Sequence, residues 1–157
     1  MQNKPNHTVN KFKNAVIATP DVADCYKSGL AALGIYKDRI VVGDTRLIDG
    51  SIDIDEGVKK KYADANRWDY AVSYNSEVYF VEVHSAQTSQ VSKVLKKLQW
   101  LKDWLNEHAP EINKLKPKNS PAFYWIQSNN FQIQNHLPQY RKIRLAGLKP
   151  IPKLMLN

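Results

Sequence analysis

The pattern of apolar and polar positions is most informative in residues 67–85, where it predicts two short strands joined by a tight turn. Aromatic and β-branched residues crowd both sides of the polar pair Asn75-Ser76. Such residues favour strands, and a polar pair between two of these runs is typical of a hairpin. We therefore expect this hairpin to form the centre of the fold.

Side chains alternate between the two faces of a strand, so the hairpin also predicts which polar residues are neighbours. Glu82 and His84 share one face of the second strand. On the first strand, Asp69 shares a face with the small residues Ala71 and Ser73. We expect Asp69, Glu82 and His84 to lie in one cluster, with room for a ligand beside the small residues.

Residues 90–107 show the clearest helical pattern, with leucine and valine at spacings of three and four up to the proline at position 110. Lys93, Lys97, Trp100 and Trp104 fall together on the opposite side. A helix that is apolar on two sides is usually covered on both. We expect the C-terminal segment to cover the tryptophans, and the alternatives are a homodimer contact or nucleotide stacking.

The rest of the chain predicts further helices and strands that belong to an α/β fold with one mixed sheet. Residues 1–18 fit either a loose arm or an edge strand. We expect helices over residues 21–33, 56–65 (capped by Asp55) and 136–146. We expect strands at 39–42 and 122–126 and a hairpin turn at Asp49-Gly50. The tail should add an edge strand at 153–156.

Length and composition indicate one domain over residues 1–157, since 18.0 kDa with 43% apolar residues can bury one core. The sole cysteine, Cys25, excludes an internal disulfide and the cysteine pairs of a zinc site. The polar N-terminus and the lack of a long apolar run favour a cytoplasmic protein that does not span a membrane.

The net charge of +8 favours a polyanionic partner, of which nucleic acid is the commonest, although it also suits a plain basic surface. The basic side chains nearest to aromatic residues lie on two of the predicted helices. The candidate nucleic-acid-binding residues are Lys93, Lys97, Arg141, Lys142 and Arg144.

The order helix, three strands, helix, strand carries an aspartate, Asp69, on one central strand and Glu82-Val83-His84 on the next. In this the chain resembles the PD-(D/E)XK nuclease-like superfamily, also called restriction-endonuclease-like, whose common core is αβββαβ. The resemblance covers about residues 21–128, with a C-terminal helix and tail over 129–157. Trp68 stands where the family has proline, and His84 replaces its lysine.

The resemblance implies a nuclease that depends on Mg²⁺ or Mn²⁺, with Asp69 and Glu82 as metal ligands and His84 orienting or activating the attacking water. It also implies a positive charge near the site, which Lys93 or Lys97 would supply. Polar helpers and a further carboxylate come from a larger set: Gln87 and Gln90, and one of Asp24, Asp44, Asp53 and Asp55.

The alternative function is a nuclease-fold protein without catalysis that binds nucleic acid or a protein partner. Both functions explain the basic charge, and the sequence leaves open DNA or RNA as the substrate and internal or terminal cleavage.

Overall fold

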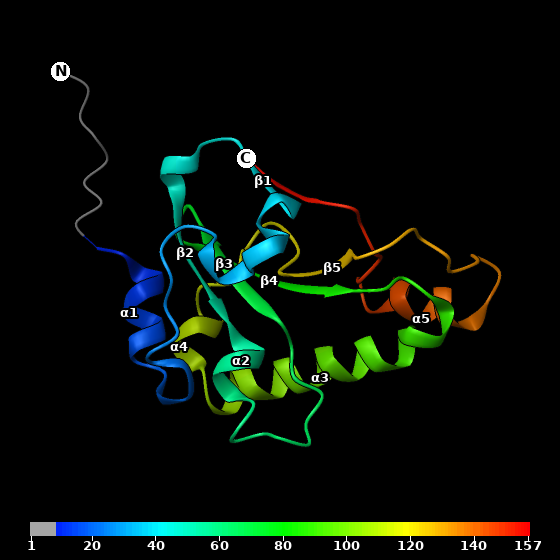
Figure 1. Cartoon of the computed structure of the whole chain (residues 1–157), viewed down its shortest axis with the longest axis horizontal. Helices are drawn as coiled ribbons and strands as arrows, with labels where there is room; N and C mark the ends of the chain where they lie inside the picture. The colour runs from blue at the N-terminus through cyan, green and yellow to red at the C-terminus, as the bar shows by residue number, and fades with distance from the viewer. Residues whose placement is uncertain (1–8) are drawn as a thin grey trace.

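A four-stranded mixed sheet forms the centre of the computed structural model, which describes residues 9–157 (Figure 1). Its strands lie in the order β2 (Ile48–Asp53), β3 (Tyr70–Tyr74), β4 (Glu77–His84) and β5 (Phe123–Gln127). The first three are antiparallel, whereas β5 runs parallel to β4. Parallel pairing needs a long connection, and the helix α3 (Val91–Glu107) provides it. The predicted mixed α/β fold is confirmed.

The hairpin β3–β4 is as predicted. Asn75 and Ser76 form the turn with positive φ angles of 50° and 64°, the combination that suits the twist of two adjacent strands. The register pairs Tyr70 with Val81. Carried one residue further, it places Asp69 opposite Glu82, so both side chains lie on the same face of the sheet.

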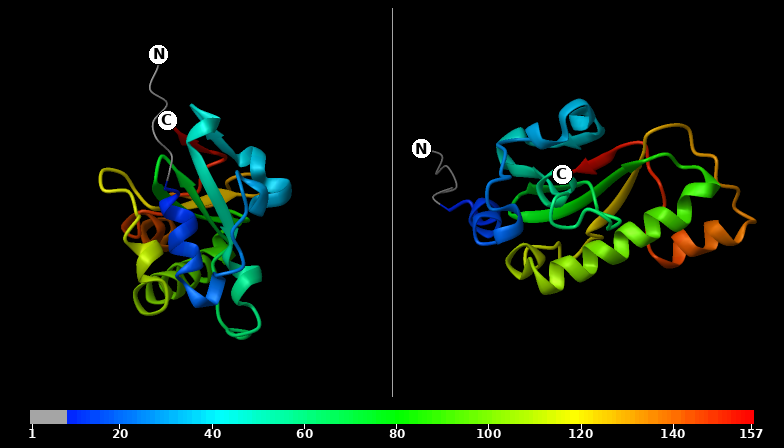
Figure 2. Two further views of the ribbon diagram at one scale, coloured as in Figure 1. Left: turned by 90° about the vertical axis from the view of Figure 1, so that its left-hand side faces the viewer. Right: turned by 60° about the horizontal axis from the view of Figure 1, so that its bottom comes forward.

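That face of the sheet packs against α3, as the predicted apolar stripe requires. Leu98 and Leu101 of the helix belong to one buried cluster with Ala71 and Phe80 of the strands. The short helix α4 (Pro110–Asn113) follows α3. The helix α5 (Pro138–Leu145) lies beside the N-terminal half of α3 (Figure 2). None of the helices in residues 9–157 is long and apolar enough to cross a membrane.

A second layer covers the opposite face of the sheet. It consists of the 3₁₀ segment η2 (Ala31–Arg39) and a small parallel sheet of β1 (Ile40–Val42) and β6 (Leu154–Leu156). Leu33 and Leu154 from this layer pack with Val72 and Val81 of the central strands. The predicted strand in the tail therefore forms, but it pairs with β1 and not with the main sheet.

The prediction of a helix over residues 21–33 is wrong. The chain forms the 3₁₀ turn η1 (Pro20–Val22) and the start of the 3₁₀ segment η2 there, and between them Lys27 exchanges two backbone hydrogen bonds with Ser51 of β2. Gly29 interrupts any helix by adopting φ of 55°. The first α-helix is instead α1 (Lys11–Ile17), which corrects the expected loose arm or edge strand for the described part of residues 1–18.

Two predictions near β2 are also wrong. Asp49-Gly50 is a bulge within the strand and not a hairpin turn. Gly50 adopts φ of 149°, and a side chain there would collide with the Tyr26 ring. The helix expected over residues 56–65 is the single turn α2 (Ile54–Val58), and Asp53 caps it in place of Asp55.

Candidate functional site

Asp69 and Glu82 occupy neighbouring positions on β3 and β4, and each is held by the backbone of the other strand. The Asp69 N–H donates to Glu82 Oε1 at 3.1 Å, and the Val83 N–H donates to Asp69 Oδ2 at 3.0 Å. Glu82 is fully buried. The fully buried Trp68 fixes the entry into β3. The two carboxylates are therefore rigidly placed, each with one oxygen satisfied by a backbone donor.

Lys97 reaches the same place from α3. Its Nζ lies 2.6 Å from Glu82 Oε2 and 3.7 Å from Asp69 Oδ1, and only 14% of its side chain is exposed. Lys93, one turn earlier on the helix, is exposed to solvent. Of the two lysines expected to supply positive charge, the structure thus brings only Lys97 to the acids.

His84 completes the cluster at its edge. Its Nδ1 lies 3.7 Å from Glu82 Oε2, and its Nε2 lies 2.9 Å from Gln90 Oε1. The donor and acceptor roles of the two ring nitrogens depend on the tautomer, and the contact with Gln90 fixes the orientation of the ring. The predicted cluster of Asp69, Glu82 and His84 is therefore present, and Gln90 orients the imidazole.

In the cluster, the carboxylates of Asp69 and Glu82 share one positive charge, that of Lys97. Burial raises the pKa of Glu82 well above its usual range, and the neighbouring Asp69 raises it further. Burial also raises the pKa of Asp69, against the opposing effects of Lys97 and the Val83 N–H. Burial alone would lower the pKa of Lys97, but the two carboxylates outweigh it and the net shift is upward. Two acids facing one ammonium favour binding of a proton or a cation.

The candidates for a further carboxylate divide clearly. Asp55 acts electrostatically on both Asp69 and Lys97, and its own carboxylate binds Arg67 Nε at 2.7 Å. Asp53 caps α2, and burial raises its pKa.

The other two candidates are occupied elsewhere or point to solvent. Asp44 forms an ion pair with Arg46 at 2.9 Å, and Asp24 is exposed next to Cys25. Asp53 and Asp55, which both interact electrostatically with Asp69, are therefore better placed than Asp24 and Asp44.

One expectation about room for a ligand does not hold. Ala71 and Ser73, the small residues on the Asp69 strand, are fully buried in the interior. The Ser73 hydroxyl donates to Asp49 Oδ2 at 2.8 Å. Space at the cluster therefore lies toward Lys97 and His84, which are both partly exposed.

Trp104 is buried and Trp100 is partly buried, and their polar and aromatic contacts come from Asp21 and Tyr62 and not from the expected C-terminal segment. Trp104 is 2% exposed, and its indole Nε1 donates to Asp21 Oδ2 at 3.0 Å. Tyr62 donates to the same oxygen at 2.7 Å and packs edge-on against the Trp100 ring, 5.7 Å between centroids. A homodimer through this face stays a prediction.

Asp21 is a polar centre that the sequence pattern did not reveal. Its carboxylate also binds Lys61 at 2.8 Å. Burial alone would raise its pKa, but hydrogen bonds from Lys61, Tyr62 and Trp104 outweigh burial, and the net pKa is lowered. Asp21 was not among the expected site residues, and only its distant partners Lys61, Tyr62 and Trp104 distinguish it.

Among residues 9–157, no group of three or more histidine, cysteine, aspartate or glutamate side chains is arranged to hold a metal ion. The two acids nevertheless suit a hard divalent cation, which prefers carboxylate oxygens and often takes only one or two from the protein. Asp69 Oδ1 and Glu82 Oε2 face Lys97 and not a backbone donor. The residues therefore fit Mg²⁺ or Mn²⁺ in kind, with Lys97 as a competitor for Glu82.

No family model matches the chain, and comparisons with curated proteins and with solved structures find no significant match.

Proposed function

We propose that the protein is a divalent-metal-dependent nuclease that hydrolyses phosphodiester bonds in DNA or RNA. The observation that carries the proposal is the meeting of Asp69, Glu82 and Lys97, from two adjacent strands and the following helix, with negative charge in excess. Without the short elements β1, α2 and α4, the order α1, β2, β3, β4, α3, β5 follows the αβββαβ core of the PD-(D/E)XK superfamily, with α1 in place of the helix expected over residues 21–33. A bound Mg²⁺ or Mn²⁺ would polarise the phosphate and lower the pKa of its water.

In this proposal Lys97 takes the place of the family lysine. Position 84 holds histidine, but the ammonium of Lys97 lies against the same glutamate oxygen, 2.6 Å away. A fixed positive charge there stabilises the negative charge that develops on a phosphate during hydrolysis. Asp69 and Glu82 would be the metal ligands, held in place by their backbone hydrogen bonds.

His84 has the separate role of accepting a proton from the attacking water. In the tautomer in which Nε2 donates to Gln90 Oε1, Nδ1 is the basic nitrogen, and it lies 3.7 Å from Glu82 Oε2, on the side of the acids. General bases of this kind contribute roughly 10²- to 10⁴-fold to rate. The division of labour between a lysine for charge and a histidine for the proton follows from their different chemistry.

A second function is a catalytically inactive protein of the same fold that binds nucleic acid or a protein partner. The short Lys97–Glu82 contact favours it, because an ammonium so close to the acid can act as a permanent structural ion pair. Here the basic residues Lys93, Arg141, Lys142 and Arg144, all exposed, would carry the binding.

The two functions separate in a cleavage assay with purified protein, labelled single- and double-stranded DNA and RNA, and Mg²⁺ or Mn²⁺. The nuclease proposal expects Asp69→Asn and Glu82→Gln to abolish cleavage and His84→Ala to lower it by about 10²- to 10⁴-fold. Glu107→Gln is the matched control, because it makes the same acid-to-amide change at an exposed residue at the far end of α3.

Cleavage that survives both acid substitutions belongs to another site or to a contaminant. A complete lack of cleavage on every substrate, together with binding that weakens steeply with salt, would instead support the inactive nucleic-acid-binding protein.

A further inference from the structure

Acidic residues are absent from two long segments of the sequence. Residues 83–102 and 112–157 contain 12 of the 23 lysine and arginine residues and none of the 15 aspartate and glutamate residues. The fold places these segments together, because the N-terminal half of α3 belongs to the first and α5, which packs against it, belongs to the second. The surface that they share therefore carries lysine and arginine side chains but no aspartate or glutamate from these segments.

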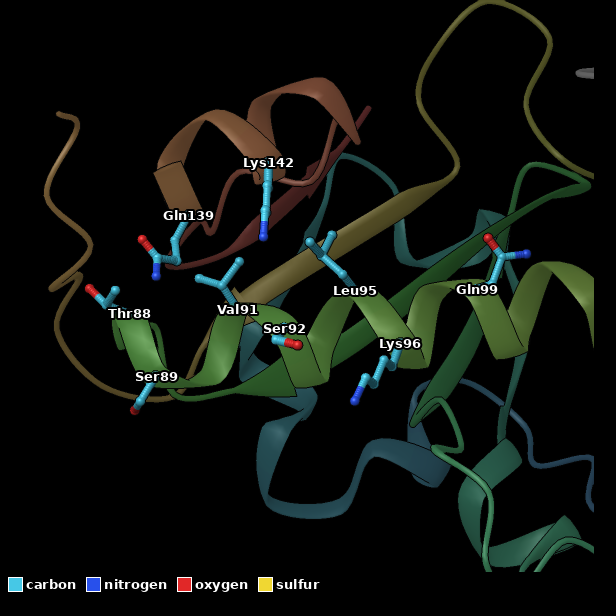
Figure 3. Close-up of a pocket in the computed structure, with 9 residues that line it drawn as sticks. All are labelled: Thr88, Ser89, Val91, Ser92, Leu95, Lys96, Gln99, Gln139 and Lys142. Atoms are coloured by element: carbon cyan, nitrogen blue, oxygen red, sulfur yellow. The ribbon is translucent and has the colours of Figure 1, made fainter. Parts of the chain in front are cut away.

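A groove of about 400 Å³ runs between these two helices (Figure 3). Leu95 of α3 supplies its accessible apolar part, above the fully buried Val91, and Lys96 and Lys142 supply positive charge. The volume is within the range of pockets that hold small ligands, roughly 300–1,000 Å³. An apolar surface flanked by cations suits a group that combines a flat apolar ring with a phosphate.

Gln139 gives the groove a polar group that lacks a partner. Figure 3 shows its side chain reaching from α5 toward Val91. Its Oε1 is buried and has no hydrogen-bond partner within residues 9–157. A buried acceptor without a donor is unfavourable, and the ring N–H and amino groups of a nucleobase are suitable donors.

Two aromatic side chains lie near the groove, Tyr140 on α5 and Phe131 in the loop that precedes this helix. Phe131 is 37% exposed and meets Tyr140 of α5 edge-to-face at 6.4 Å between ring centroids. Arg141 and Arg144 line a neighbouring hollow together with Tyr140. Aromatic rings interleaved with cations are the usual surface for single strands, whose bases stack on the rings while the phosphates meet the charges.

We propose that the groove between α3 and α5 binds one unpaired nucleotide of a single-stranded nucleic acid, with Gln139 contacting the base and Lys142 the phosphate. This deepens the proposed nuclease, on which it rests, by naming the substrate as single-stranded. In a duplex the bases are paired and stacked, so no base would be available to Leu95 and Gln139.

The groove and the acid cluster are linked through the 3₁₀ turn η4 (Thr88–Gln90), since Thr88 and Ser89 line the groove while Gln90 contacts His84. On α3 itself, Leu95 and Gln99 of the groove lie about 160° around the helix from Lys97, which contacts the acids. The proposal therefore concerns the binding of a nucleotide, and it does not fix where the bond that is cleaved would lie.

The test measures binding by fluorescence anisotropy, in EDTA so that no cleavage occurs. The probes are a labelled single strand of about 12 nucleotides, the same strand with abasic sites, and the duplex. We expect the single strand to bind more tightly than the duplex and more tightly than the abasic strand. Gln139→Leu should lower the affinity for the base-bearing strand by about 2- to 10-fold and leave the affinity for the abasic strand unchanged.

Lys142→Gln should weaken both strands and reduce the slope of log affinity against log salt by about 0.7. Lys37→Gln makes the same charge change on η2, on the opposite face of the sheet, and should change neither. Equal binding of the base-bearing and abasic strands, or equal effects of Lys142→Gln and Lys37→Gln, would overturn the proposal.

The outcomes separate the groove from the nuclease. Cleavage that requires Asp69 and Glu82, combined with binding that is insensitive to Gln139→Leu, would support the nuclease proposal and contradict the proposed groove. Base-dependent binding without cleavage in Mg²⁺ or Mn²⁺ would support the proposed groove and contradict the nuclease proposal.

Discussion

Replacing Lys97 by methionine tests the charge balance on which the proposed site depends. The substitution keeps the length of the side chain but removes the ammonium that lies 2.6 Å from Glu82, which is fully buried. Removing one partner of a buried ion pair typically costs about 3–5 kcal/mol. Because Lys97 and Asp69 retain some exposure, we expect the lower end, about 3 kcal/mol.

For a chain of this size that loss lowers the melting temperature by roughly 6–12 °C. Thermal unfolding in EDTA near pH 8 measures it, with Lys93→Met as the control that should stay within about 0.5 kcal/mol. The double variant Lys97→Met/Glu82→Gln should recover most of the loss, since it also removes the unpaired charge. The resulting double-mutant cycle isolates the Lys97–Glu82 interaction.

Divalent cations provide the second half of this test. If Asp69 and Glu82 hold a metal, Mn²⁺ should stabilise Lys97→Met more than the wild type, because the ion replaces the missing charge without a competitor. Saturation at a hundred times the dissociation constant would return about 2.7 kcal/mol. Equal melting temperatures for Lys97→Met and Lys93→Met would refute the charge argument, and no response of Lys97→Met to Mn²⁺ or Mg²⁺ would refute the metal site.

Three further predictions concern pH, a buried acid and the hairpin turn. The pKa of Glu82 in the folded state is raised above the ordinary glutamate value of 4.5, so the folded state holds this proton more tightly than the unfolded state does. In EDTA the free energy of unfolding of the wild type should therefore fall as the pH rises from 4.5 through the folded-state pKa of Glu82. Urea unfolding at a series of pH values measures this, and Glu82→Gln should flatten the dependence; an unchanged slope would contradict it. Asp21→Ala leaves the Tyr62 hydroxyl and Trp104 Nε1 without an acceptor, so unfolding should become easier by about 1–3 kcal/mol, whereas an unshifted transition would show that water replaces the carboxylate. Ser76→Gly relieves a φ of 64° and should stabilise the protein by roughly 0.5–1 kcal/mol in the same assay; a loss of stability would mean that the serine side chain holds the turn.

Local patterns were sufficient where a structure depends on neighbours in the chain. The hairpin followed from strand-forming residues on both sides of Asn75-Ser76, and alternation then placed Glu82 and His84 on one face. The helix over residues 91–107 followed from its apolar stripe. Local patterns failed for residues 21–33, where helical spacing was outweighed by Gly29 and by backbone pairing with β2.

The sequence by itself determined the central hairpin, the long helix, the mixed α/β class and the approach of Asp69 to Glu82, because each depends on side-chain periodicity and a short turn. Only the tertiary structure decided that Lys97 enters the acid cluster while Lys93 faces solvent. It also decided that Asp21 and Tyr62 contact the tryptophans. These contacts join residues far apart in the chain, and their positions depend on how α3 packs on the sheet, which no local spacing encodes.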